Sequence, residues 1–206
     1  GKEYSLFLEL NHASIFAALA PVQYDGQIDG AIITCHRMAR NTMGKKKGKD
    51  NKALVQTRFE DILQESQSMK ECVRLAKLYA MSRHPVVLMG EAGTEARLMA
   101  QSIHNNSPYS QGPFLDVPCG GLSDEEQRET IFGDKGAAVQ ANGGSLLIRD
   151  AHQLTAANQY RLYQLIRFHV CHGQDSGQMR KVETRVMVTV EIPLGSLAGQ
   201  GKLRKD

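Results

Sequence analysis

Apolar residues along the chain gather in short runs, and from residue 59 onward these runs alternate with segments in which apolar positions recur at helical spacing. The short runs predict buried strands at residues 85–89, 114–117, 145–148 and 185–190. The helical spacing predicts helices at residues 66–81, 95–104, 124–131 and 156–168, with Ser66 and Ser123 as N-caps of the first and third. Strands that alternate with helices indicate an α/β fold with a parallel sheet flanked by helices.

Residues 4–38 have a different pattern, with three apolar runs and few helical signals. The runs are Leu6–Leu8, Ser14–Tyr24 and Ile28–Thr34, and Asp25-Gly26 between the last two is a hairpin signal. Three strands alone would be a weak unit. They therefore either complete a sheet that begins upstream or pack on the rest of the chain. The lysine-rich segment that follows, residues 41–58, is predicted to be a basic linker.

Composition narrows the function classes. Hydrophobic residues make up 41% and charged residues 23% of the chain, which allows a packed core. The net charge of +3 is too small to indicate nucleic-acid binding. Four scattered cysteines without C-x-x-C spacing suit free thiols in a reducing compartment. The sequence has no signal-peptide pattern and no long apolar run, so we expect a cytoplasmic protein that does not enter a membrane.

The segment between the strand at 85–89 and the next helix has the context of a phosphate-binding loop, which lies between a strand and a helix. A working loop reads G-x-x-x-x-G-K-[ST]. This candidate site is Gly90, Glu91, Ala92, Gly93, Thr94, Glu95, Ala96 and Arg97. Glu95 stands at the second glycine and Ala96 at the lysine. Arg97 lies one step further along the helix and should point elsewhere.

Several further segments have recognisable family patterns in the same order along the chain. They read F-x-x-I-x-x-x-S-x-x-M from Phe59, A-x-x-I-H-x-x-S from Ala100, P-F-x-x-x-x-C from Pro113, I-F-G at 131–133, A-x-G-G-S-L from Ala141, Q-x-x-L from Gln159, R-V-M from Arg185 and G-x-L-R-x-D from Gly201. Over residues 59–206 the chain resembles the AAA+ domain of bacterial sigma-54-dependent transcription regulators. The resemblance implies a P-loop AAA+ core without the helical lid, and residues 1–40 resemble the last strands of a PAS sensory domain.

The chain departs from this family at the positions that carry its chemistry. The Walker B strand of the family ends in Asp-Glu, which hold Mg²⁺ and polarise water; here the residues are Arg149 and Asp150, and an arginine should repel Mg²⁺. The sensor Thr-Asn is replaced by Val190-Glu191. Only residues 134–142 separate Gly133 from Gly143, so most of the loop that contacts sigma-54 is missing, with residues 136–138 as its remnant. Arg204 falls where the family has an arginine finger.

These departures indicate a non-catalytic regulatory module, with no catalytic residue, no metal and no resident cofactor. We expect it to act by signal-dependent self-association, giving a homo-oligomer, or by partner binding. The resemblance implies contact with the transcription machinery through the full-length regulator, and with DNA only through a domain absent from this chain. Two alternatives stay open. One is an ATP-binding activator domain with weak nucleotide affinity. The other is a PAS-type small-molecule sensor, with Phe7, Phe16 and Ile32 as candidate pocket residues.

Two groups of polar residues have the composition of a chemical site. His169, Cys171 and His172 are metal-ligand types, but three ligands so close in sequence rarely complete a site. Asp150 with His152 has the composition of an acid/base pair at the carboxyl end of a strand, where α/β folds bind ligands. A polar residue that merely ends the strand is the simpler interpretation.

Overall fold

The computed structural model describes residues 4–10, 13–24, 27–37, 57–91, 94–172 and 179–204, with the strands before residue 38 given by their backbone. The strands are β1 (Tyr4–Leu10), β2 (Ala13–Tyr24), β3 (Gln27–Arg37), β4 (Val86–Met89), β5 (Phe114–Pro118), β6 (Ser145–Arg149), β7 (Val170–His172), β8 (Met179–Lys181) and β9 (Arg185–Val190). The helices are α1 (Gln67–Ala80), α2 (Ala96–Asn105), α3 (Asp124–Gln127), α4 (Ala137–Gln140), α5 (Ala156–Phe168) and α6 (Leu194–Gly199), with single turns η1 (Phe59–Asp61), η2 (Arg128–Phe132) and η3 (Ala151–Gln153).

The four strands predicted between residues 85 and 190 pair in parallel, in the order β4-β9-β6-β5. Their bounds differ from the predicted ones by one residue at most. Because every strand enters this sheet from the same end, all four carboxyl ends lie along one edge. The predicted α/β class with a helix-flanked parallel sheet is confirmed.

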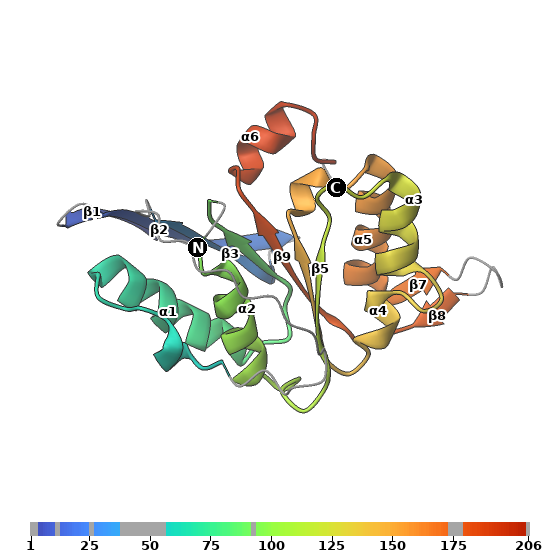
Figure 1. Cartoon of the computed structure of the whole chain (residues 1–206), viewed down its shortest axis with the longest axis horizontal. Coiled ribbons are helices and arrows are strands. Elements are labelled where there is room, and N and C mark those ends of the chain that lie inside the picture. Colours follow the sequence, from blue (N-terminus) through green and yellow to red (C-terminus); the bar gives the residue numbers. More distant parts are fainter. Residues whose placement is uncertain are drawn as a thin grey trace.

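The three N-terminal strands extend the same sheet (Figure 1). β1, β2 and β3 form an antiparallel meander, and β3 then pairs in parallel with β4, from Ala31 opposite Val86 to Thr34 opposite Met89. Of the two possibilities left open by the sequence, the strands therefore pack on the rest of the chain. The PAS-like assignment of residues 1–40 stays a prediction, and the predicted linker lies almost entirely outside the described residues.

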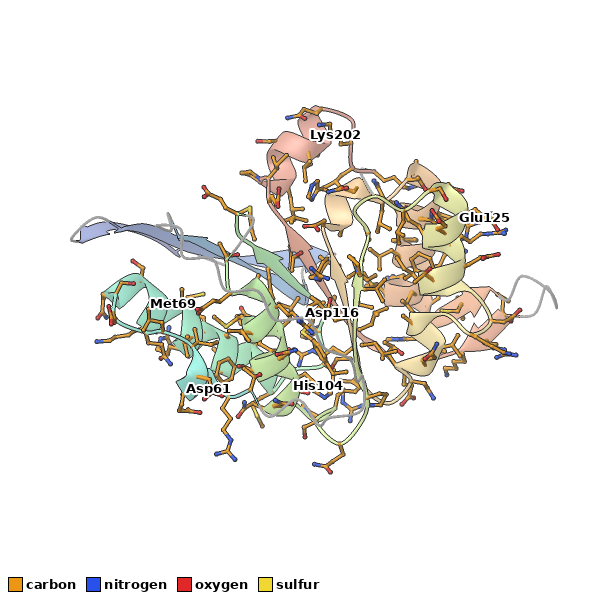
Figure 2. All side chains as sticks on the ribbon, in the orientation of Figure 1. Asp61, Met69, His104, Asp116, Glu125 and Lys202 are labelled. Carbon is orange, nitrogen blue, oxygen red and sulfur yellow. The ribbon has the colours of Figure 1, made fainter. Side chains whose placement is uncertain are left out.

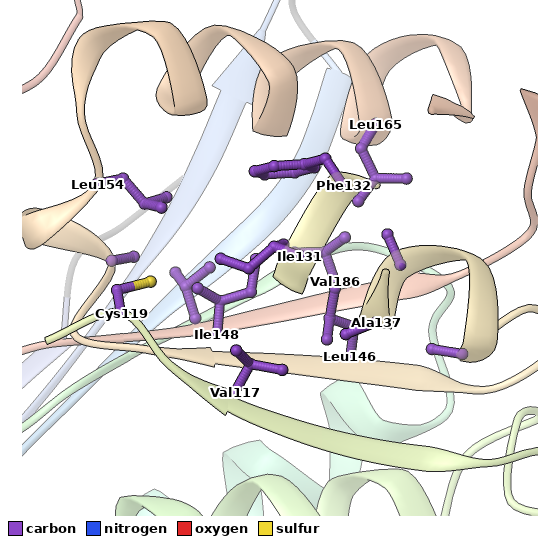
Figure 3. Packing of buried hydrophobic residues seen from close by; sticks show 14 of the residues in the cluster. Val117, Cys119, Ile131, Phe132, Ala137, Leu146, Ile148, Leu154, Leu165 and Val186 are labelled. Carbon is purple, nitrogen blue, oxygen red and sulfur yellow. The ribbon is translucent and has the colours of Figure 1, made fainter. Parts of the chain in front are cut away.

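Helices cover both faces of the sheet and bury two apolar clusters. On one face, α1 and α2 pack on residues such as Leu88, Leu147 and Met187. On the other, η2, α4 and α5 pack on Leu146, Ile148 and their neighbours (Figure 3). The alternation along β6, with Leu147 facing one cluster and Leu146 and Ile148 the other, is the two-residue period of a strand buried on both sides.

Helix ends follow the capping expectations, with one difference. The Oγ of Ser66 accepts a hydrogen bond from the Met69 N–H at 3.1 Å, and Ser123 forms a capping box with Glu126. The helix predicted at 124–131 is α-helical only to Gln127. It continues as the π turn η2, which brings the consecutive side chains of Ile131 and Phe132 into the core.

Candidate functional site

The loop after β4 has the predicted placement at the carboxyl edge of the sheet. The Gly90 N–H donates to the carbonyl of Val190 at the end of β9, at 3.0 Å, and the Thr94 N–H donates to the Glu91 carbonyl at 3.1 Å. Glu95 is the N-cap residue of α2, and Ala96 is the first helical residue. Ala92 and Gly93 lie outside the described residues. The strand–loop–helix arrangement that a phosphate loop requires is therefore present.

A group of three charged side chains lies beside this loop and was not predicted as a unit. The Asp116 carboxylate forms ion pairs with two arginines: Oδ2 lies 2.7 Å from the Nε of Arg97, and Oδ1 accepts a hydrogen bond from the Nε of Arg149 at 2.8 Å. Asp116 comes from β5, Arg97 from the first turn of α2 and Arg149 from the last position of β6. Figure 2 labels Asp116 near the middle of the molecule. We call these three residues the arginine–aspartate cluster.

The cluster accounts for both arginines singled out in the sequence. Arg97 points to Asp116, as expected from its place one step beyond the lysine position. Arg149, predicted to stand at the position of the family's metal-binding aspartate, directs its guanidinium to Asp116. Asp116 is 11% exposed at its side chain, and a charge so enclosed requires a partner. An acidic residue inside a predicted buried strand is the sequence signal that could have identified it.

Asp150 begins the turn that follows β6 and has left-handed backbone angles, φ 58° and ψ 43°. Its N–H donates to the Oγ1 of Thr189 at 2.9 Å, and its carbonyl accepts from the Gln153 N–H at 2.8 Å. Within the described part of the chain the buried Nδ1 of His152 has no hydrogen-bond partner. Asp150 and His152 are therefore not joined as an acid/base pair.

The connection predicted to replace the sigma-54 loop begins with a tight turn. The Gly136 N–H donates to the Gly133 carbonyl at 2.8 Å, so that only Asp134 and Lys135 lie between them. A Cβ at Gly136 would come within 2.7 Å of the Ile131 carbonyl oxygen, so the turn is closed against η2. α4 begins directly afterwards, at Ala137. The predicted remnant of the loop, residues 136–138, is therefore the start of a short helix.

Arg204 lies against its own chain. Its guanidinium carbon is 5.0 Å from the centre of the Tyr160 ring on α5, within cation–π range. The side chain of Gln159 holds the same segment, accepting from the Arg204 N–H at 3.0 Å and donating to the Lys202 carbonyl at 2.7 Å. The residue predicted at an arginine-finger position thus contacts α5 of the same subunit.

The remaining predicted site residues are those of the sensor position, the PAS pocket and the histidine–cysteine cluster. Val190 ends β9 as predicted for the sensor strand, and Glu191 follows it. The side chains of Phe7, Phe16 and Ile32 lie outside the described residues, although β1 and β2 place Phe7 opposite Phe16. His172 is likewise described only by its backbone. Among the described residues no helix combines the length and apolar character needed to span a bilayer.

The residues at the carboxyl edge do not fit Mg²⁺-ATP. Mg²⁺ requires oxygen ligands, and β6 ends in the guanidinium of Arg149. A phosphate loop requires a cation near the β- and γ-phosphates, and the methyl group of Ala96 cannot supply it. Glu95 adds a carboxylate to a loop that would have to accept a polyanion. No catalytic step through ATP or Mg²⁺ is therefore assigned to this chain.

Solved structures with a similar fold include NtrX and a sigma-54 activator domain. NtrX from Brucella abortus in complex with ATP superposes with a TM-score of 0.67 at 21% identity, covering 71% of this chain and 34% of that one. The P-loop NTPase domain of a sigma-54 activator from Escherichia coli gives a TM-score of 0.50 at 21% identity, covering 67% and 84%. Both confirm the AAA+ P-loop fold.

Sequence relatives are bacterial transcription regulators. The transcriptional activator RocR of Bacillus subtilis is 30% identical over 204 residues, covering 90% of this chain and 43% of RocR. The regulatory protein TyrR of Haemophilus influenzae is 30% identical over 155 residues, covering 72% and 49%. The chain thus spans less than half the length of either relative. The sigma-54 interaction domain matches residues 62–206, and the chain belongs to that family.

Proposed function

We propose that this chain is a non-catalytic regulatory module of a bacterial transcription regulator, which keeps the AAA+ framework but neither binds nor hydrolyses ATP productively. The observation that carries the proposal is the ion pair between Arg149 and Asp116 at 2.8 Å. The ion pair places the guanidinium of Arg149 where the family is expected to have a carboxylate ligand for Mg²⁺. Ala96 and Glu95 in the loop support the same conclusion, because they remove the lysine and add a negative charge.

The module acts through association. Its signal changes how the AAA+ core pairs with a second copy or with another protein, and the transcription machinery is reached through the full-length regulator. DNA contact belongs to a different domain of that regulator. The shortened connection supports regulation without remodelling of sigma-54, since only residues 134–142 lie between Gly133 and Gly143, where the resemblance places the sigma-54 loop.

Nucleotide binding provides the direct test. We would titrate the native chain with ATP and Mg²⁺ by calorimetry, beside the double variant Glu95→Gly/Ala96→Lys and a triple variant that adds Arg149→Asp. We expect the native chain to give no binding heat. The double variant should bind weakly, and the triple variant should bind more tightly in Mg²⁺ than in its absence, because Arg149→Asp restores a carboxylate ligand.

A charge control separates loop repair from general attraction of ATP. Glu95→Gly/Ala96→Lys raises the formal charge by two, one from each substitution. Glu129→Lys raises it by two as well, from −1 to +1, at an exposed position. It should leave the calorimetric trace flat. Tight ATP binding by the native chain would overturn the proposal and favour the alternative of an ATP-binding activator domain.

Self-association is tested separately by sedimentation velocity over a range of protein concentrations. A native chain that associates, in a manner unchanged by ATP and Mg²⁺, supports a module that works through pairing alone. Association that requires ATP would contradict the proposal. A strictly monomeric chain would remove self-association and leave partner binding as the mechanism.

A further inference from the structure

The side chain of Asp116 on β5 contacts both the end of β6 and the start of α2. Within the described sheet, β5 is an edge strand whose pairing partner is β6, from Phe114 opposite Ser145 to Pro118 opposite Arg149. Asp116 adds a side-chain link from β5 to the last residue of β6, and a second link to the first turn of α2 through Arg97. The two links use different oxygens of one carboxylate, so they are made at the same time.

The charges of the cluster explain why the two links support each other. One carboxylate lies between two guanidiniums, and the group has a net charge of +1 from two cations and one anion. Asp116 is 11% exposed, whereas Arg97 is 61% and Arg149 39% exposed at the side chain. Charge-assisted hydrogen bonds to an enclosed carboxylate are stronger than those of fully exposed pairs, because water competes less well for the acceptor.

We propose that the Arg149 guanidinium is a built-in cation, which binds the Asp116 carboxylate and thereby holds β5, β6 and the start of α2 in one arrangement without any bound ligand. This inference rests on the proposed function and assigns Arg149 a structural role, in addition to the absence of a metal ligand at its position. A guanidinium that belongs to the chain cannot dissociate from it. The carboxyl edge therefore does not switch between a cation-bound and a cation-free state.

Hydrogen exchange measured by mass spectrometry tests the link directly, since it reports local opening of each segment. In Arg149→Met, which leaves the ion pair between Arg97 and Asp116 in place, the amides of β5 should exchange about three- to tenfold faster than in the native chain. Asp116→Asn should have at least this effect, because it leaves two guanidiniums facing each other. The double variant Asp116→Asn/Arg149→Met should exchange no faster than Asp116→Asn alone.

Arg74→Met is the matched control. Arg74 forms a 2.7 Å ion pair with Glu71 on the surface of α1, with 62% of its side chain exposed, and the pair links no second element. It should leave exchange in β5 and α2 unchanged. If Arg149→Met gives the same exchange as Arg74→Met, the built-in cation is refuted. Should Arg149→Met fail to fold, Arg149→Lys decides, because an ammonium group keeps the charge and should keep most of the protection.

Divalent ions distinguish this inference from the proposed function. Arg149→Asp brings a carboxylate next to Asp116, so its β5 amides should exchange faster and be protected again by Mg²⁺ alone. Native exchange should be insensitive to Mg²⁺. Protection of the native β5 amides by Mg²⁺ alone would contradict the built-in cation. Protection of the native β5 amides that appears only with ATP would contradict the proposal that the chain does not bind ATP. The comparison of Arg149→Met with Arg74→Met would still decide whether the built-in cation exists.

Discussion

The Nη1 of Arg185 donates a hydrogen bond of 3.0 Å to the carbonyl of Ala80, which ties the start of β9 to the C-terminus of α1. The same guanidinium donates to the carbonyls of Tyr79 at 2.8 Å and His84 at 3.2 Å. Arg185 is 2% exposed, and burial lowers its pKa to about 10, so it stays protonated at neutral pH. It thus gives a donor to the carbonyl of Ala80, the last residue of α1.

Replacing this arginine should be costly. Arg185→Met removes the arginine donor from the Ala80 and His84 carbonyls, whereas the Tyr79 carbonyl keeps its donors from Ser82, and we expect a loss of about 3 kcal/mol in the free energy of unfolding, measured by urea denaturation. Arg83→Met, an exposed position in the α1–β4 connection, serves as the control and should change stability by less than about 0.5 kcal/mol. Equal losses in the two variants would show that the carbonyl contacts of Arg185 contribute nothing measurable.

His104 should make stability depend on pH. Burial lowers its pKa to about 4, with the positive charge of Arg185 as a second cause, and its Nδ1 lies 2.8 Å from the Oγ of Ser145. The folded chain therefore keeps His104 neutral, whereas the unfolded chain takes up a proton below about pH 6.5. Stability from this group is complete above that pH and is lost as the pH falls towards 4, by on the order of 3 kcal/mol.

Comparing urea unfolding at pH 7 and pH 4.5 isolates this contribution. His104→Gln should lose distinctly less stability over that interval than the native chain, because it has no imidazole to protonate. His84→Gln, at an exposed position, should retain the native pH dependence. A native-like slope in His104→Gln would assign the acid sensitivity to other groups.

Gly144 is required by a close approach of two backbone segments. A Cβ there would lie 2.0 Å from the Pro113 carbonyl oxygen, and neither backbone can yield easily, since the Ser145 N–H donates to that same oxygen at 2.8 Å. We expect Gly144→Ala to destabilise the chain by more than about 3 kcal/mol, measured as the shift in the urea midpoint. Gly195→Ala is the control. Its Cβ would meet no atom within 4 Å, and the alanine should be neutral or slightly stabilising in α6.

The described cysteines should be unreactive in the folded chain. Burial raises the pKa of Cys171 to about 11, and burial together with the Asp150 carboxylate raises the pKa of Cys119 to about 12. Thiolate is the reactive form, so little is present at pH 8. Iodoacetamide should modify Cys72, Cys119 and Cys171 only after unfolding, as read from peptide mass spectra. Rapid labelling of Cys119 in the native chain would show that the carboxyl edge opens.

Much of the fold follows from local patterns. α5 and β9 begin and end where the sequence predicts, because α5 is a long helical segment and β9 a run of mainly β-branched and apolar residues. The short elements were missed: α4, α6 and the β7–β8 hairpin have too few residues to show a period, and tertiary contacts decide their conformation. The parallel pairing of β3 with β4 is likewise a long-range contact that no local signal specifies.

The site was predictable only in part, for a similar reason. Family spacing located Arg149, Asp150 and the loop before α2, and elementary helix geometry indicated that Arg97 points away from the loop. The role of Asp116 was not predicted, because a hydrophobic pattern assigns residues to a strand but does not say which charged side chains contact one another. The link between Arg97 and Arg149 depends on one carboxylate between them, and it emerges only once β5, β6 and α2 are placed in space.

The turn between Gly133 and Gly136 has an evolutionary consequence. Its two ends are closed by a single backbone hydrogen bond, while the core side chains on either side, Phe132 and Ala137, are fixed by the sheet and by α5. Segments of different length can be gained or lost between such anchored ends with little effect on the rest of the fold. We therefore expect insertions and deletions at this turn to change the surface of the domain while its core stays intact.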